Sequence, residues 1–349
     1  MTPEEARALF PVLERVAYLN AGTFGPLARQ TLDAMQAELR RDGEEGRHGR
    51  AYFKRVLGLR EELRGRLARL VGAESAQVAL TSSTTDGCNI VLAGLGLGPA
   101  DEVVTTAEEH FGLIGPLHAS GARVVVAPAG PDALLAAVTP RTRLVAVSQV
   151  LWTSGRALPV RELRERAGVP VLVDGAQSVG AIPVEAAGLD FLTISGQKWL
   201  CGPDATGALV VADPERLRVG RPSYFAQTSY EPTGAFVARD GAARFDPGWL
   251  APAALAGLLA ALDVRPDWWH ERTRASAERL RDLLAPHVEV VPGDATLVAF
   301  RHDDPPTLVA QLAEKGVVVR EIPGTGLVRA SCGWWTSDED LDRLVDAIA

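Results

Sequence analysis

The stretches VLVDGAQS (residues 171–178) and LTISGQKWLCGP (residues 192–203) decide the fold of this 349-residue chain. Val169–Asp174 is apolar up to its last residue, which is typical of a strand buried on both faces of a parallel sheet. Asp174 ends this strand, and Lys198 comes just after the next one. Ligands of open α/β folds bind at the carboxyl ends of parallel strands, so we expect both side chains to enter one crevice.

The same alternation of short apolar strands and helical stretches extends from about residue 50 to residue 211. Ala51–Val71 carries leucines at helical spacing, and glycine and proline separate the elements that follow. Strands buried on both faces predict an α/β fold, with a mostly parallel seven-stranded sheet between helices. The predicted strands are Gln77–Thr81, Glu102–Thr106, Arg123–Ala127, Leu144–Ser148, Val169–Asp174, Phe191–Ser195 and Ala208–Val211.

The remaining sequence predicts a second, smaller domain. Residues 220–248 are rich in Gly, Pro, Ser and Tyr with weak periodicity, which predicts a long irregular loop. Ala251–Leu262 and Asp267–Leu284 are predicted helices, and the tail from about residue 287 has the order strand, strand, helix, strand, strand, helix. We therefore expect an N-terminal segment (1–20) that packs with the small domain, a large domain (21–262) and a small α+β domain (263–349).

Charge and composition disfavour several classes of protein. The formal net charge of -8 argues against a nucleic-acid partner, which needs a basic face. No apolar run approaches the roughly 20 residues that cross a bilayer, and the acidic first residues differ from a signal peptide, so no membrane partner is expected. Cys88, Cys201 and Cys332 form no Cys-x-x-Cys pair, which favours a soluble protein in a reducing cytoplasm.

Lys198 and Asp174 together have a chemical meaning that neither residue has alone. A lysine amine whose pKa is lowered by burial or nearby positive charge forms a Schiff base with an aldehyde cofactor. A buried carboxylate beside a pyridine nitrogen keeps that nitrogen protonated, so that the ring accepts electrons from a substrate carbanion. Considered singly, Lys198 is more often a surface lysine and Asp174 a helix cap. Their combination within this flanking sequence predicts a cofactor site.

The flanking sequence resembles the class V aminotransferase family of enzymes that use pyridoxal 5'-phosphate (PLP). The resemblance runs from Tyr18–Gly22 to Arg329–Ser331, nearly the whole chain. It implies the PLP-dependent transferase fold (fold-type I), a homodimer with active sites at the subunit interface, and an amino-acid substrate. The family also contains cysteine desulfurases, cysteine and cystine C–S lyases, and enzymes similar to isopenicillin N epimerase. Cys201–Pro203 is most similar to the lyase and epimerase-like members.

The resemblance implies further contacts with the cofactor. Thr84 and Thr85 match the phosphate-binding segment, and a helix N-terminus does attract anions, although a plain helix cap is the alternative. His110 matches the imidazole that stacks on the cofactor ring, where an isolated histidine would otherwise be structural. The other implied contacts are Gln177 at the phenolic oxygen or a neighbouring group, and Ser195 and Gln197 on the phosphate side.

Three residues are expected on the substrate side. Arg329 matches the family's ligand of the α-carboxylate, a group that a planar guanidinium binds bidentately, whereas a surface ion pair is the alternative. Asn20 is assigned to substrate binding as well. Trp152 is either a core residue or a contact of the substrate.

Two departures from the family pattern restrict the function. Trp249 stands where relatives often have a threonine that reaches the phosphate of the neighbouring subunit, so this contact is in doubt. The position of the desulfurase nucleophile falls near Glu314, and the nearest cysteine, Cys332, comes after Arg329 instead. A persulfide formed on a cysteine thiolate is therefore disfavoured.

The sequence leaves the reaction open. Lys198 is expected to act as general base at Cα, after which β-elimination gives a C–S lyase, protonation at the cofactor an aminotransferase, and protonation at Cα an epimerase. A non-catalytic dimer is a different class of answer, which the co-occurrence of Lys198, Asp174, His110 and Arg329 disfavours. An NAD enzyme lacks support because no Gly-x-Gly-x-x-Gly follows an early strand.

Overall fold

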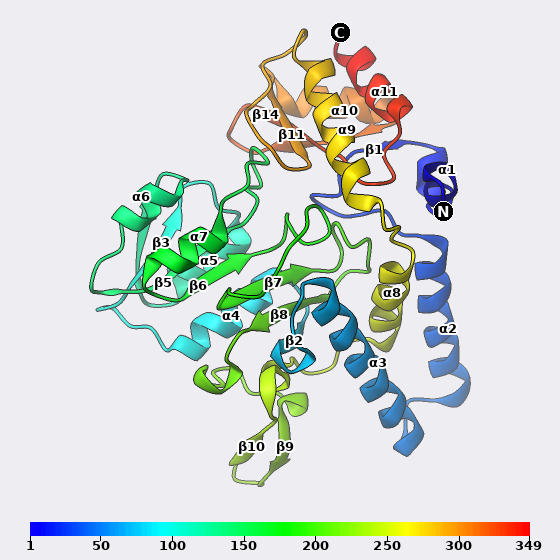
Figure 1. Cartoon of the computed structure of the whole chain (residues 1–349). Helices are drawn as coiled ribbons and strands as arrows, with labels where there is room; N and C mark the ends of the chain where they lie inside the picture. The colour runs from blue at the N-terminus through cyan, green and yellow to red at the C-terminus, as the bar shows by residue number, and fades with distance from the viewer.

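The computed structural model describes all 349 residues, and its centre is a seven-stranded sheet (Figure 1). The strand order is β2-β8-β7-β6-β5-β3-β4. The neighbouring strands from β7 to β4 run parallel, and β8 runs antiparallel to both β7 and β2, which confirms the mostly parallel sheet. The bounds are β2 Val78–Thr81, β3 Glu102–Thr106, β4 Arg123–Ala127, β5 Thr142–Ser148, β6 Val171–Asp174, β7 Phe191–Ser195 and β8 Gly207–Val211.

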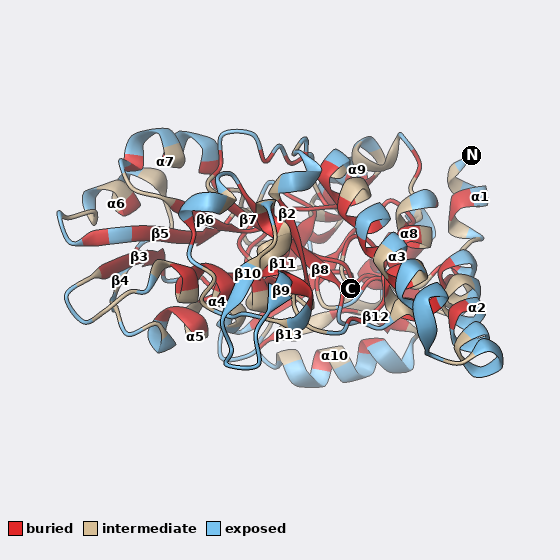
Figure 2. Cartoon of the chain, turned by 90° about the horizontal axis from the view of Figure 1, so that it is seen from below, coloured by how far each residue is buried: buried red, intermediate tan, exposed pale blue.

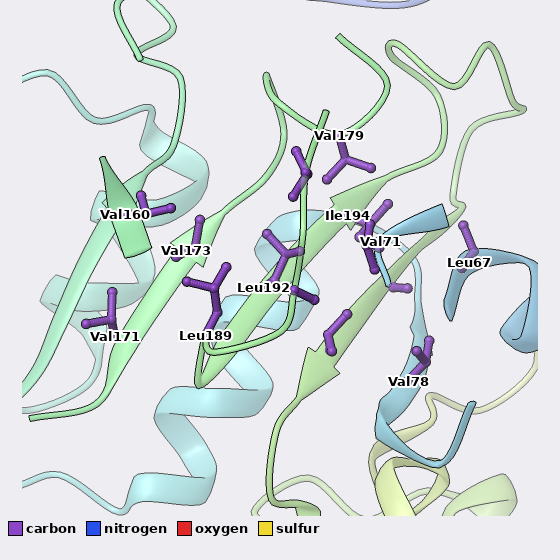
Figure 3. Close-up of a cluster of buried hydrophobic side chains, with 14 of the residues drawn as sticks. Leu67, Val71, Val78, Val160, Val171, Val173, Val179, Leu189, Leu192 and Ile194 are labelled. Atoms are coloured by element: carbon purple, nitrogen blue, oxygen red, sulfur yellow. The ribbon is translucent and has the colours of Figure 1, made fainter. Parts of the chain in front are cut away.

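Successive residues of the inner strands pack into separate cores on the two faces of this sheet. Val171 and Val173 of β6 lie in one cluster (Figure 3), and Leu172 lies in the other. Each fully buried valine, leucine or isoleucine contributes about 1.5–3 kcal/mol, which explains why continuous apolar runs form these strands. The surrounding helices are α3 Gly49–Leu70, α4 Thr84–Leu95, α5 Phe111–Ala119, α6 Pro131–Ala136, α7 Val160–Ala167 and α8 Pro252–Asp263.

A smaller unit with its own core follows α8 along the chain. Its antiparallel sheet has the order β11-β14-β13 and is packed by helices (Figure 1). The N-terminal residues join this unit: β1 (Ala17–Tyr18) pairs in parallel with β12, and Arg7 of α1 (Pro3–Arg7) forms an ion pair with buried Asp340. The other bounds are α9 Trp269–Leu284, β11 Leu297–Arg301, α10 Pro305–Glu314, β12 Val317–Val318, β13 Arg320–Ile322, β14 Leu327–Ser331 and α11 Asp338–Ile348.

Three parts of the chain differ from the sequence-based prediction. The tail has the order β11, α10, β12, β13, β14, α11, with one strand before α10 and three after it instead of two and two. The expected loop at 220–248 contains an antiparallel hairpin of β9 (Gln227–Tyr230) and β10 (Phe236–Ala238), whose side chains are mostly exposed (Figure 2). A hairpin that buries so little lacks the apolar alternation by which strands are predicted. Helix α2 (Arg29–Glu45) was not predicted either, because its sequence is largely charged and only Thr31 and Glu38 are buried. No helix combines the length and the apolarity that a membrane span requires.

Asp246 fastens the segment after the hairpin to the large domain. It is 2% exposed, and its carboxylate accepts hydrogen bonds from Arg60 Nη2 (2.9 Å), Arg64 Nη2 (2.7 Å) and the backbone N–H of Leu80 (2.9 Å). These contacts join α3, β2 and the end of the irregular segment. Asp246 is the only carboxylate partner of buried Arg60, whereas Arg64 also pairs with the exposed Glu61 (3.3 Å).

An Asp246→Ala variant is expected to lose about 3–5 kcal/mol of unfolding free energy, because buried Arg60 loses its only carboxylate partner and Arg64 retains only the exposed Glu61. Urea titration followed by circular dichroism measures the loss. Glu289→Ala is the matched control, since it removes an exposed carboxylate paired with Arg301 and should change the free energy by less than about 1 kcal/mol. An equal effect of the two substitutions would contradict the assignment of Asp246 as a buried anchor.

Candidate active site

A cavity of about 230 Å³ opens at the carboxyl ends of the parallel strands and is closed on one side by the small domain. Sixteen residues line it, and ten of the eleven predicted site residues are among them. These ten are Thr84, Thr85, His110, Trp152, Asp174, Gln177, Ser195, Gln197, Lys198 and Arg329. The other six, which the sequence analysis did not assign, are Gly22, Thr23, Phe24, Ser83, Ala176 and Arg320.

Asp174 is the last residue of β6 and is held in one orientation. Its Oδ1 accepts a hydrogen bond from the backbone N–H of Ala176 (2.8 Å) and a longer one from the Thr193 hydroxyl (3.3 Å). The residue is only 3% exposed, so its carboxyl group lines the cavity from a strand end that is shielded from solvent. A partner with a protonated nitrogen suits this position.

Lys198 lies on the loop after β7. The loop is pinned at its base, because the N–H groups of Gly196 and Gly202 donate to the carbonyl oxygens of Thr206 and Gly196. Burial lowers the pKa of Lys198 from 10.5 to about 8; nearby Asp174 opposes this shift, and Arg329 and Arg320 add to it. Near pH 7, a larger fraction of the Lys198 amine is therefore uncharged than in an ordinary lysine. A nucleophile or base must be in this uncharged form.

The chain contains only three lysines, so the acid–base behaviour of Lys198 is directly measurable. In cofactor-free protein, we expect acetylation of Lys198 by acetic anhydride to rise with pH around a midpoint near 8. An ordinary lysine has its midpoint near about 10.4. Peptide mass spectrometry resolves the three sites, with the exposed Lys54 and Lys315 as references for reagent decay. If the midpoint of Lys198 were that of an ordinary lysine, burial would not lower the pKa of its amine.

His110 caps the N-terminus of α5. Its Nδ1 accepts a hydrogen bond from the backbone N–H of Gly112 (3.0 Å), so the proton of the neutral ring resides on Nε2. Burial and then the nearby Lys198 lower the pKa of His110. Its ring meets Trp152 edge to face at 5.0 Å. These contacts fit a neutral ring platform and hydrogen-bond donor rather than a base.

Glu109, which the sequence analysis did not single out, fixes the loop that carries His110. Its carboxyl group accepts hydrogen bonds from the Ser148 backbone N–H (3.0 Å) and from the Thr106 hydroxyl (2.9 Å). Burial raises the pKa of Glu109 to about 7 against these hydrogen bonds. Ser148 is paired in register with Asp174, so Glu109 ties the His110 loop to the strand that ends in the aspartate.

The opposite end of the cavity suits a phosphate group. Ser83 caps α4 by accepting a hydrogen bond from the N–H of Asp86 (3.1 Å), and Thr84 and Thr85 form the first turn. Ser195 donates to Gln197 Oε1 (2.9 Å) on the facing wall. Hydroxyl groups and free N–H groups at the N-terminus of a twelve-residue helix are the donors that bind phosphate.

Arg329, from β14, has unused donors. It is 1% exposed, its Nη1 donates to the carbonyl oxygen of Trp152 (2.7 Å), and its Nε and Nη2 have no hydrogen-bond partner. Burial and then Arg320 lower the pKa of Arg329 to about 9, which still leaves the guanidinium charged at neutral pH. Buried donors without partners are costly, and a carboxylate satisfies both at once.

Gln177 and Asn20 form hydrogen bonds within the chain, and Trp249 lies at the surface. Gln177 lines the cavity; its Nε2 donates to Gly22 O (2.8 Å) and its Oε1 accepts from the Trp199 indole (2.9 Å), which leaves one N–H. Asn20 is outside the lining and accepts a hydrogen bond from Thr23 (2.8 Å). Trp249 is 54% exposed and packs against other aromatic rings.

These groups fit PLP at each of its functional ends. With PLP bound, Lys198 would supply the amine for the aldehyde, Asp174 the acid for the ring nitrogen, His110 a flat ring, and the α4 N-terminus the phosphate donors. The unpartnered donors of Arg329 would suit a substrate carboxylate. The fold and this donor set define a PLP-dependent enzyme.

Comparisons with known proteins agree. The family model described as Aminotransferase class-V matches residues 17–344, and the chain belongs to this family. Isopenicillin N epimerase from Streptomyces clavuligerus is 29% identical over 99% of this chain and 97% of its own length. A probable cysteine desulfurase from Halalkalibacterium halodurans is 28% identical over 100% and 97%. The solved complex of the cystine C–S lyase C-DES with cysteine persulfide is 28% identical, with a TM-score of 0.90 over 97% of this chain and 98% of that one.

Proposed function

We propose that this enzyme is a C–S lyase that cleaves the Cβ–S bond of cysteine or cystine by β-elimination. The observation that carries the proposal is one cavity that combines the lysine amine and the unpartnered arginine donors without any cysteine. The amine and the arginine recognise an α-amino acid, and the missing thiol excludes sulfur transfer to the protein.

The residues of the chain perform separate parts of this reaction. Arg329 binds the α-carboxylate and thereby fixes the amino acid, and Lys198 as a neutral amine accepts the Cα proton. When bound, the cofactor supplies the electron sink that Asp174 keeps effective. The electron pair of the Cα–H bond forms a Cα=Cβ bond and expels the sulfur from Cβ as a thiolate or persulfide. Hydrolysis of the released aminoacrylate gives pyruvate and ammonia.

The state of the three cysteines supports a lyase over a desulfurase that carries sulfur on its own thiol. Cys88, Cys201 and Cys332 are buried, and none lines the cavity. Burial raises the pKa of Cys332 to about 12 and raises those of Cys88 and Cys201 as well. Buried thiols of this kind are inert as nucleophiles.

Arg320 favours cystine over cysteine as the substrate. This second arginine lines the cavity, its Nη1 donates to Thr23 Oγ1 (3.3 Å), and it forms no ion pair with an acidic side chain. Its guanidinium lies over the Trp152 ring at 5.9 Å, so Trp152 belongs to the substrate side of the cavity in this proposal. Cystine carries a second carboxylate beyond the sulfur, and Arg320 offers it a cation.

The second candidate is amino-acid epimerisation, which the similarity to isopenicillin N epimerase favours. Transamination is the third outcome that the same first step permits. An assay that offers cysteine, cystine and a panel of amino acids, with and without pyruvate, separates the three. We expect sulfide or persulfide together with pyruvate. Stereochemical inversion without sulfur release would favour an epimerase, and a new amino acid made from pyruvate would favour an aminotransferase.

We also propose a homodimer in the cytoplasm. Apolar side chains that a monomer would leave in water gather around Trp249 and on the hairpin, which supports a partner surface. These side chains are Phe53, Tyr224, Tyr230, Phe236, Val237 and Trp249. Sedimentation velocity is expected to give twice the 37.1 kDa mass of the chain. A monomer at all concentrations would rule out the dimer.

A further inference from the structure

The segment Asn20–Gly25, which we call the strap, runs between the two domains along one wall of the cavity. On the small-domain side, Ser331 N donates to Leu19 O (2.8 Å), and Gly22 N donates to Ser331 Oγ (3.1 Å). On the large-domain side, Gly22 O accepts from Gln177 (2.8 Å), and Gly25 N donates to Gln197 O (2.8 Å). The strap is therefore hydrogen-bonded to Ser331 and Gln197, which lie close to Arg329 and Lys198 in the sequence.

Two glycines of the strap lie too close to these functional residues to carry a side chain. A Cβ on Gly22 would stand 2.7 Å from Arg329 Nη2, which is one of the two donors without a partner. A Cβ on Gly25 would stand 2.1 Å from the carbonyl oxygen of Lys198. Neither glycine has a positive φ, so the chain needs them for space and not for backbone conformation.

We propose that the strap is a spacer that fixes the Arg329 guanidinium relative to Lys198, with Gly22 as the positioning residue. An amino acid is held at its carboxylate by Arg329 while its amine and Cα–H face Lys198, so a productive geometry requires a fixed separation. Gly22 sets this separation because it lies directly against Nη2 and is tied to both domains. The inference rests on the amino-acid chemistry of the proposed function but not on the fate of the sulfur.

Two carbonyl reagents test the positioning with holoenzyme. Aminooxyacetate and methoxyamine both attack the cofactor aldehyde, but only aminooxyacetate carries a carboxylate for Arg329. The ratio of their reaction rates, followed by the loss of the visible cofactor band, measures carboxylate recognition independently of turnover. We expect Gly22→Ala to lower this ratio at least about tenfold, through displacement of a charge-assisted hydrogen bond. Gly58→Ala is the control, because a Cβ there meets no atom within 4 Å.

Additional variants separate positioning from a general packing defect. In the Gly22→Ala/Arg329→Leu double variant, the ratio should be no lower than in Arg329→Leu alone, since Gly22 acts through the arginine. Ser331→Ala, which frees Gly22 N without adding volume, should lower the ratio by a smaller factor. An unchanged ratio in Gly22→Ala, or additive losses in the double variant, would overturn the proposal.

A crystal structure of cofactor-free Gly22→Ala provides a second measurement. We expect the Arg329 guanidinium to be displaced from its position beside residue 22, with the Lys198 loop unchanged. An undisplaced guanidinium would overturn the proposal. The lyase assignment is tested separately by sulfur release from cystine. The two carbonyl reagents react with the cofactor aldehyde in a lyase, an epimerase or an aminotransferase alike.

Discussion

A Lys198→Ala variant is expected to lose all measurable turnover. In the proposed mechanism, the substitution removes both the covalent anchor of the cofactor and the base that takes the Cα proton. Such a base alone contributes about 10²–10⁴ in rate. The visible absorbance of the bound cofactor should change as well, because its aldehyde no longer has a lysine partner. Product assays and absorbance spectra of the same preparation measure both effects.

The variant should still bind the cofactor, because the helix N-terminus, Asp174 and His110 remain. Lys54→Ala is the matched control, since Lys54 is exposed on α3 and outside the cavity. Turnover above a tenth of the parent value in Lys198→Ala would remove the lysine from the mechanism.

An Arg329→Leu variant is expected to lose about 10²–10⁴ in kcat/KM, mainly through KM. Two hydrogen bonds from a charged group are worth about 1.5–3 kcal/mol each, and both are lost together. Stability should fall little, because Nε and Nη2 of the arginine have no partner within the protein. Steady-state kinetics with cystine, together with thermal unfolding, separates the two effects.

Two further variants sharpen this test. Arg329→Lys retains the charge but not the planar fork, so it should recover only part of the lost kcat/KM. Arg301→Leu, at an exposed position of the neighbouring strand β11, is the control and should behave like the parent enzyme. If Arg329→Leu changed kcat with KM unaffected, the α-carboxylate would have another ligand.

The central sheet and the meeting of Asp174 with Lys198 could be predicted from apolar strands and their ends, whereas most other cavity residues were predicted from the family resemblance. Asp174 and Lys198 come directly after apolar strands, so their convergence follows from parallel pairing alone. Arg329 was found through the family resemblance, since no periodicity of the sequence brings a C-terminal strand to this cavity. The mixed direction of β8 has no local signal, because a buried strand looks the same in either orientation.

The missed features depend on contacts between distant segments. In the sequence, Arg320 cannot be distinguished from other arginines of the small domain. Only the fold shows that it lines the cavity. Glu109 gains its role from Ser148, which lies 39 residues away in sequence. The strap needs its glycines because Arg329 and Lys198 lie so close to them. A local sequence pattern cannot show such a contact between distant segments.

The pairing of β1 with β12 has a consequence for how the chain folds during its synthesis. Ala17 pairs with Val317, and Arg7 with Asp340, so this N-terminal segment obtains its partners only after the strands and helices of the small domain have been synthesised. The large sheet has all its strands by Val211 and is complete much earlier. During synthesis the large sheet is therefore available before the N-terminal segment is paired, and the cavity is completed only once β14 with Arg329 has been made.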